Sequence, residues 1–378
     1  MSQDVTVNRH NNFSTIRIIL ASLVICSHSF ELVDGNRSRE ILTRLFGTIS
    51  FGVFAVDGFF LVSGYLITQS YLQSKNLDYL LKRVLRIYPA YIVAFIISIG
   101  LGELSINGGG GLNAKLALHN LFNLFFLLGP IMKNPYPGSF YAALNGSMWT
   151  ISYEFHCYIM VLVLGIFGIL QRRLVVFFCT ITLILAYLVH PEIYVTPNYN
   201  LSRMAVGAQA YVPHSFSRLL RSAVIEGHSA DIRLFGIFLV GSCFNLFQNR
   251  LTYKSRYAVL AFISLMLCMF SNHLAEPGLA IFGGYLMFWF ALEYKPLKIS
   301  KFFDSTDLSY GIYLYGWPVQ KTLIRLMPSI DPYAVCLLTL CICAVIAYFS
   351  WKFIEKPCIR LKHRVRLYVA EPAKTESA

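Results

Sequence analysis

The sequence predicts an all-α protein, a polytopic bundle of about ten transmembrane helices with both termini in the cytoplasm. Three observations predict it: the composition, a series of long apolar segments, and the distribution of Lys and Arg between them. Of the 378 residues, 56% are hydrophobic and only 13% are charged, whereas soluble proteins carry about 25% charged residues. Because hydrocarbon penalises each unpaired charge, lipid is the solvent that explains this deficit.

Ten apolar segments are long enough, or nearly so, to cross a bilayer, which takes about 20 helical residues. They cover residues 13–33, 49–70, 88–104, 150–170, 174–190, 232–248, 256–271, 275–293, 308–327 and 331–353. Two further segments, 119–131 and 200–224, are short or weakly apolar and leave the span count open by two. The nine cysteines show no metal spacing, and most fall in apolar segments as packed side chains.

The distribution of positive charge gives the bundle an orientation. With the N-terminus inside, 20 of the 32 Lys and Arg residues fall in inside segments and eight in the longer outside loops. Cytoplasmic loops carry this excess in membrane proteins, so the net charge of +13 is explained without nucleic acid. We therefore expect a transmembrane domain over residues 11–362, followed by a polar cytoplasmic tail over 363–378.

Ionisable residues within the spans are candidates for function, because each is costly in lipid. Arg17 and His28 of the first span are eleven residues apart, so both lie on one helix face, about 16 Å apart along the axis. Arg17 is placed near the cytoplasm. His28 is placed towards the outside, at the level of Asp57 in the second span and Glu154 in the fourth. An imidazole oriented by a carboxylate suits general base catalysis; a structural ion pair between helices is the alternative.

Two arginines mark the cytoplasmic start of the third span, where Arg83 and Arg86 are i,i+3 neighbours on one helix face. Guanidinium groups side by side suit a phosphate-bearing ligand, because each binds phosphate bidentately. The same spacing also serves topology and contact with lipid headgroups. The pair alone therefore does not select the ligand.

Six motifs in this order resemble the acyltransferase family 3 of integral membrane O-acyltransferases, and the resemblance runs from about residue 11 to 362. The first motif is Arg17 and His28, separated by ten residues. The others are VDGFFLVSG (56–64), RVLRIYP (83–89), SMWTISYE (147–154), LSYGIYLYGWP (308–318) and FIEKP (353–357). The chain departs from the family at Gly316, where members often have a His. That His is either not required here or replaced by another group.

The resemblance implies that an acyl group, usually acetyl, moves from cytoplasmic acetyl-CoA or another acyl-CoA to a sugar hydroxyl of a polysaccharide, lipopolysaccharide or related glycoconjugate. The implied location is the bacterial inner membrane. The implied partners are membrane lipid, acyl-CoA and a carbohydrate or glycolipid acceptor. A homo-oligomer or a polysaccharide assembly complex stays open, and no metal or nucleic acid is expected.

The resemblance also implies a role for each candidate residue. Arg83 and Arg86 hold the CoA phosphates, and the arginine of the first span holds donor phosphate or orders that span. His28 deprotonates the acceptor hydroxyl or a covalent relay group. One of the two intramembrane carboxylates, Asp57 or Glu154, orients the imidazole and stabilises its charge.

The same residues allow two other interpretations. Intramembrane carboxylates with a histidine also suit a proton relay, which predicts a transporter or flippase for a lipid-linked sugar or acyl intermediate. The absence of an internal repeat and the ordered motifs favour the enzyme. Gly316 keeps a non-catalytic scaffold as the third interpretation.

Overall fold

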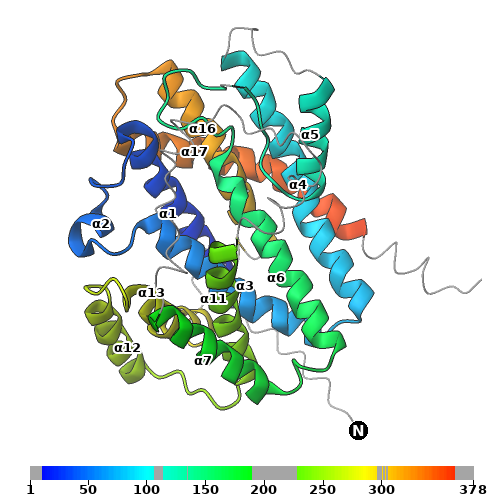
Figure 1. Cartoon of the computed structure of the whole chain (residues 1–378), viewed down its shortest axis with the longest axis vertical. Helices are drawn as coiled ribbons and strands as arrows, with labels where there is room; N and C mark the ends of the chain where they lie inside the picture. The colour runs from blue at the N-terminus through cyan, green and yellow to red at the C-terminus, as the bar shows by residue number, and fades with distance from the viewer. Residues whose placement is uncertain are drawn as a thin grey trace, which may run out of the picture.

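The computed structural model describes residues 11–105, 114–133, 135–189, 228–295, 300, 303 and 305–361, and its regular elements there are helices with no β-strand. Figure 1 shows their arrangement. The all-α prediction is confirmed. In chain order the elements are α1 (Phe13–Asp34), α2 (Ile41–Phe46), α3 (Phe51–Leu72), α4 (Asn76–Ser105), α5 (Ala114–Phe125), η1 (Gly146–Met148), α6 (Trp149–Ile166), α7 (Arg173–Val189), α11 (His228–Leu246), α12 (Ser255–Cys268), α13 (Ala275–Gly278), η2 (Leu279–Gly283), α14 (Gly284–Leu292), α16 (Ser309–Leu326), α17 (Pro332–Ser350) and η3 (Trp351–Glu355).

Several helices are long and apolar enough to cross a membrane. In the described part of the chain there are six such stretches: α1, α3, α4, η1 with α6, α13 through α14, and α17 with its continuation to Leu361. Shorter apolar helices lie in α7, α11 and α12. The twelve residues of α5 extend only about 18 Å, too short for a span.

The count of about ten spans and the cytoplasmic termini stay predictions. Residues 1–10, the tail 363–378 and the segment 200–224 lie outside the described residues.

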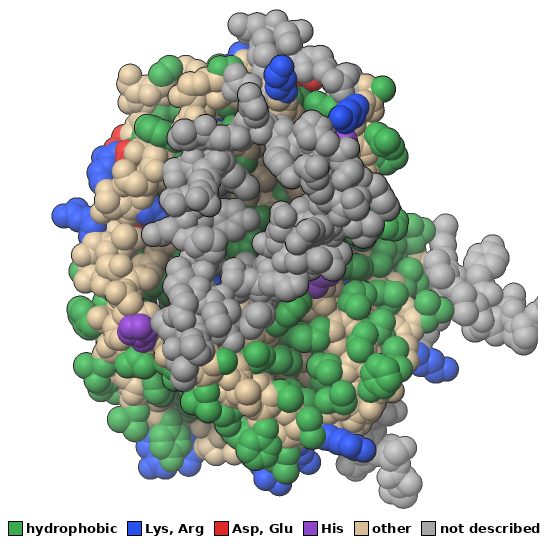
Figure 2. Space-filling view, in the orientation of Figure 1, with side chains coloured by type: hydrophobic (Ala, Val, Ile, Leu, Met, Phe, Trp, Pro, Cys, Tyr) green, Lys and Arg blue, Asp and Glu red, His purple; other side chains and the backbone are tan. Residues whose placement is uncertain are grey.

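The surface of the bundle is apolar where a soluble protein would be polar. On α17, Leu337, Val345 and Phe349 are more than half exposed, and on α12 Leu260 and Ile263 are at least half exposed. Figure 2 shows hydrophobic side chains spread over the lower half of one face, with Lys and Arg along its lower edge. Apolar faces of this extent fit a lipid surrounding.

The centre of the bundle is built around α1 and α3. Helix α3 packs closely against α11, since a Cβ on Gly64 would lie 2.0 Å from the Phe238 carbonyl oxygen and one on Gly241 2.0 Å from that of Leu61. Small residues allow such close backbone contact between membrane helices. Helix α1 packs against α3, α16 and α17. The two helices that carry the first two motifs are therefore held from several sides.

Helix α6 begins inside the bundle rather than at its outer surface. The Asn145 amide donates to the Leu314 carbonyl oxygen at 2.9 Å, and the hydroxyls of Thr150 and Tyr313 are 2.5 Å apart. Leu314 is only about one and a half turns beyond the start of α16 at Ser309. The chain between α5 and α6 therefore descends into the bundle before α6 starts, and this shifts every residue of α6 along the length of the bundle.

Candidate active site

A pocket of about 360 Å³ opens between α1, α3, α4 and α6. Its lining includes Arg17 of α1 and Lys82, Arg83 and Arg86 of α4; we call it the arginine pocket. The three arginines predicted to hold the donor therefore surround one cavity, and several cations around a cavity favour an anionic ligand. Among the described residues, no group of three or more His, Cys, Asp and Glu is placed to hold a metal ion.

Two carboxylates orient two of these arginines. Asp307 Oδ2 accepts from Arg17 Nη1 at 2.7 Å and from Arg86 Nη2 at 2.6 Å, while Glu355 Oε2 accepts from Arg86 Nη1 at 2.6 Å. Glu355 ends the π-helical turn η3, and its side chain is fully buried. Burial alone would raise the pKa of Asp307, but the two guanidinium groups hold that pKa well below its usual range. Asp307 is therefore ionised, and the guanidinium groups have fixed directions.

Arg83 differs from the other two arginines because no carboxylate contacts it among the described residues. Its Nη2 donates to the Ser70 hydroxyl at 3.4 Å. Its guanidinium carbon lies 5.9 Å from the ring centre of Tyr79 and 5.8 Å from that of Tyr158. Its buried Nε has no hydrogen-bond partner in the described structure. Arg83 thus keeps donors available for an anion, while the rings support its planar group.

Glu154 lines the arginine pocket. Its Oε1 accepts from the Ser63 hydroxyl at 2.8 Å and from the Tyr158 hydroxyl at 2.5 Å. It makes no hydrogen bond with His28, although the sequence had placed the two at one depth. The difference follows from the deep start of α6, which carries Glu154 towards the arginines. Glu154 therefore fixes Tyr158, whose ring supports Arg83.

His28 lies near the other end of α1 and has a different carboxylate partner. Its Nδ1 is 3.0 Å from Glu31 Oε2, and Arg37 Nη2 donates to the same oxygen at 2.8 Å. The His28 side chain is 11% exposed and that of Glu31 5%, and the rings of His28 and Trp317 pack edge to face with their centres 4.9 Å apart. With Glu31 ionised, Nδ1 carries the proton and Nε2 keeps a lone pair. We call His28 and Glu31 the histidine site.

A loop lies over the histidine site and is fastened to α16. We call this loop, residues 136–145, the outer cover. Trp317 Nε1 donates a hydrogen bond to the Ala143 carbonyl oxygen of this cover at 3.1 Å. The ammonium of Lys321 donates to the Tyr141 carbonyl oxygen, and Lys321 is only 3% exposed. Trp317 contacts both the imidazole and the ring of Tyr141. The cover and the imidazole are therefore joined through one side chain.

Asp57 belongs to a separate buried cluster. Arg233 Nη1 donates to Asp57 Oδ1 at 2.7 Å and lies 3.4 Å from Glu276 Oε1. This joins α3, α11 and α13, with Asp57 1% and Arg233 4% exposed. The structure shows no hydrogen bond between Asp57 and His28. The ion-pair partner of Asp57 in the structure is Arg233.

Comparison with known proteins identifies the family. A family model of the acyltransferase domain matches residues 10–351. The chain belongs to this acyltransferase family. It is 25% identical over 364 residues to the O-acetyl transferase of Shigella phage Sf6, covering 93% of this chain and 96% of the phage protein. It is 25% identical over 386 residues to Nodulation protein 10 of Rhizobium leguminosarum bv. viciae, covering 96% of each. No solved structure matches.

The protein is thus an O-acyltransferase, and three of its site carboxylates were not singled out from the sequence. Glu31 follows His28 by three residues, a spacing that places both on one helix face. Asp307 directly precedes the 308–318 motif, and Glu355 lies within the 353–357 motif. Each could have been found as a partner for a cation already singled out, because charges in a membrane occur in pairs.

Gly316 is the position where the resemblance implies a His in many family members, and the structure shows its surroundings. A Cβ on Gly316 would lie 2.9 Å from the Ile25 side chain. One turn later the Gln320 amide donates to the Ile25 carbonyl oxygen at 2.7 Å and to the Ser29 hydroxyl at 2.8 Å. Helix α16 therefore lies directly against α1 beside the histidine site, and a His at 316 would displace Ile25.

Proposed function

We propose that this acyltransferase transfers an acetyl group from cytoplasmic acetyl-CoA to a hydroxyl of a carbohydrate acceptor in the bacterial inner membrane. The acceptor is a surface polysaccharide, a lipopolysaccharide or a secreted oligosaccharide. The observation that carries the proposal is the placement of two sites on α1, with Arg17 in the arginine pocket and His28 at the histidine site. Eleven residues of helix separate them by about 16 Å. A donor with phosphates at one end of a long flexible arm and a thioester at the other fits this separation.

The arginine pocket is the proposed phosphate site. Arg83 retains donors for a phosphate, and the carboxylate-bound Arg17 and Arg86 present the remaining positive charge in fixed directions. Glu154 acts here by holding Tyr158 against Arg83. In this proposal Glu154 positions the donor site and does not contact the reacting atoms.

The histidine site is the proposed place of reaction. His28 Nε2 takes the proton of the acceptor hydroxyl while the hydroxyl oxygen forms a bond to the carbonyl carbon of the thioester. The carbon–sulfur bond then breaks, CoA leaves as a thiolate, and the imidazolium returns the proton to the sulfur. Glu31 holds the ring through Nδ1 and stabilises the positive charge that forms.

Asp57 is assigned a supporting role in this proposal. Its ion pair with Arg233 is buried and joins α3 to α11, away from the hydrogen bonds of His28. Breaking one partner of such a pair leaves an uncompensated charge. Asp57 therefore contributes by keeping α3 in place against α1, and a direct catalytic role would need a contact that the described structure lacks.

The decisive experiment uses purified protein in detergent, without any gradient. We expect release of CoA from acetyl-CoA only when an extract of surface glycans is added, with a matching mass increase of about 42 Da per acetylated hydroxyl, the mass of the acetyl group less the hydrogen it replaces. In His28→Ala the rate should fall by about 10³-fold. His273→Ala, which removes an exposed histidine, is the matched control and should keep the wild-type rate.

Two results would contradict the proposal. If a correctly inserted His28→Ala protein still carried out O-acetylation, His28 would not be the general base. No consumption of acyl-CoA by the wild-type protein without a gradient would favour the transporter instead. Mass spectrometry of surface and secreted glycans from cells with and without the gene then identifies the acceptor.

A further inference from the structure

A second groove lies between α12 and α14 and shares no lining residue with the arginine pocket. Its volume is about 1130 Å³. Its walls are apolar, with Val259 and Phe262 from α12 facing Leu286 and Trp289 from α14. Val259 and Phe262 are 59% and 54% exposed. The groove is therefore an open apolar channel at the lipid-facing surface, of a width set by two neighbouring helices.

The polar mouth of this groove lies at the end of the bundle where α1 begins. The Asn12 amide, which precedes α1, donates to the carbonyl oxygens of Phe290 at 3.0 Å and Tyr294 at 3.2 Å. The Tyr65 hydroxyl, in the second half of α3, donates to Gln248 at 2.9 Å. These contacts put the ends of α11 and α14 on the side that the charge distribution predicts to be cytoplasmic.

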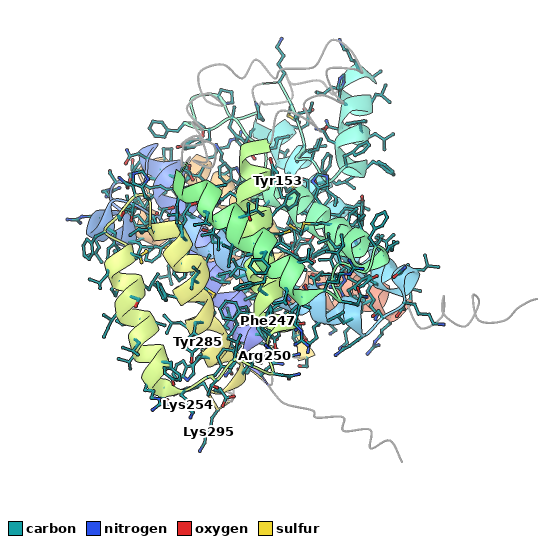
Figure 3. The ribbon with its side chains drawn as sticks, turned by 60° about the horizontal axis from the view of Figure 1, so that its bottom comes forward. Tyr153, Phe247, Arg250, Lys254, Tyr285 and Lys295 are labelled. Atoms are coloured by element: carbon teal, nitrogen blue, oxygen red, sulfur yellow. The ribbon has the colours of Figure 1, made fainter. Side chains whose placement is uncertain are left out.

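Positive side chains gather at this mouth. Lys254 and Lys295 line the groove, and Figure 3 shows both projecting from the lower edge of the molecule. Arg250 precedes Lys254 by four residues in the chain. Arg256 follows in the first turn of α12. The groove is lined by one carboxylate, that of Glu293. None of the four cations, which are Arg250, Lys254, Arg256 and Lys295, forms an ion pair with a described residue. The mouth therefore carries net positive charge for a negatively charged group.

Aromatic residues fix the shape of the mouth. The Tyr285 hydroxyl donates to the Thr252 carbonyl oxygen at 2.8 Å and accepts from the Lys254 backbone N–H at 3.2 Å. Trp289 and Tyr294 pack with ring centres 6.0 Å apart. Tyr and Trp favour the depth of the lipid headgroups. Lys254 therefore starts from a fixed backbone at the level where a phosphate group lies.

We propose that this groove binds one anionic glycerophospholipid from the cytoplasmic leaflet. The headgroup phosphate lies between Lys254 and Lys295, and an acyl chain follows the channel past Trp289 and Phe262. Apolar walls alone accept any lipid chain, whereas cations that form no ion pair with the described residues select a headgroup with net negative charge. The site does not depend on acyl transfer, because none of its residues belongs to the arginine pocket or the histidine site.

The test measures quenching of Trp289 fluorescence in nanodiscs by lipids with brominated chains. The fluorescence of Trp289 is the difference between the wild-type protein and Trp289→Phe. At equal mole fraction, brominated phosphatidylglycerol should quench this fluorescence more strongly than brominated phosphatidylcholine. In Lys254→Gln/Lys295→Gln the apparent affinity for phosphatidylglycerol should fall about 25-fold, since each lysine near a membrane surface contributes about fivefold. Arg172→Gln/Arg173→Gln removes the same charge from two exposed positions at the start of α7 and should keep the preference.

Several results would overturn the proposal. Equal quenching of the wild-type protein by both brominated lipids would show that the groove does not select charge. An equal loss in the Arg172→Gln/Arg173→Gln control would show only diffuse attraction to the surface. Protection of Trp289 from brominated phosphatidylglycerol by an equimolar polyprenyl phosphate would assign the groove to an isoprenoid carrier instead. The comparison of the two brominated lipids does not use the double substitution, so a folding defect in that variant leaves the test decisive.

Discussion

The two ends of α1 differ in how they use charge. In the arginine pocket, Arg17 and Arg86 share the carboxylate of Asp307, and helices α1, α4 and α16 meet through these bonds. At the histidine site, one imidazole meets one carboxylate from the same helix, under the outer cover. The first arrangement is a network between helices around an open cavity, whereas the second is a local pair.

In the proposed function, this difference separates binding of the donor from the chemical step. Guanidinium groups stay protonated throughout the physiological range, so the arginine pocket attracts an anion without taking part in proton transfer. An imidazole exchanges a proton near neutral pH, so the histidine site suits a reaction that moves one proton. If this division holds, substitutions at the two ends should change different kinetic constants.

The largest expected effect is at Glu31. Glu31→Gln keeps the shape of the side chain but removes the charge that orients His28 and stabilises its protonated form. We expect kcat to fall about 10³-fold, with an unchanged KM for acetyl-CoA. Steady-state release of CoA measures both constants. Asp34→Asn, which loosens an ion pair with the exposed Arg39, is the control. If KM changed as much as kcat, the histidine site would also contribute to binding of acetyl-CoA, and the two ends of α1 would not have separate roles.

The next effect concerns Asp57 and is one of stability. Asp57→Leu leaves Arg233 without its 2.7 Å partner, so the protein should lose about 3 kcal/mol of stability, seen as a lower Tm in detergent. Activity per folded molecule should fall less than fivefold. The double variant Asp57→Leu/Arg233→Leu should recover part of the Tm. An unchanged Tm with lost activity would instead place Asp57 among the catalytic residues.

A smaller effect is expected at Arg83. Arg83→Gln removes the guanidinium that has no carboxylate partner in the described structure, so the KM for acetyl-CoA should rise about tenfold, the value of one charged hydrogen bond. The value of kcat should stay within threefold of wild type. Arg173→Gln, at an exposed position, should change neither constant. A fall in kcat without a change in KM would move Arg83 from binding to chemistry.

The smallest effect is expected at Lys321. Lys321→Met removes the bond to the Tyr141 carbonyl oxygen, so amide hydrogen exchange in the outer cover should speed up about fivefold. Turnover should change less than threefold, because the histidine site keeps its own contacts. Lys133→Met, at an exposed lysine near the cover, should leave exchange unchanged. Equal exchange in both variants would mean that the other contacts of the cover, including those of Trp317 and Asn145, hold it without Lys321.

Helix periodicity made the sequence informative about α1 and α4. Counting turns placed Arg17 and His28 on one helix face, and the i,i+3 spacing grouped Arg83 with Arg86. In the structure, Arg17, Arg83 and Arg86 line one pocket. The apolar composition of the sequence, which is typical of membrane proteins, likewise predicted an all-helical fold. These inferences needed only the geometry of a single regular helix.

Contacts between helices could not be predicted in the same way. Depth was estimated on the assumption that each span starts at the membrane surface, and η1 and Asn145 break that assumption for Glu154. Equal depth also says nothing about rotation, so it could not show that Asp57 turns towards Arg233. The pairing of His28 with Glu31 was within reach, because it needs only the i,i+3 rule already applied to the arginines.

The placement of Arg17 and His28 on one uninterrupted helix restricts how this protein can change length. A single residue inserted between them would rotate His28 by about 100° relative to Arg17 and carry it off the shared face. An insertion in the outer cover, by contrast, lengthens a loop whose two ends can adjust. The stretch from 17 to 28 therefore sets both the distance and the relative rotation of Arg17 and His28, and we expect an insertion or deletion there to disturb both.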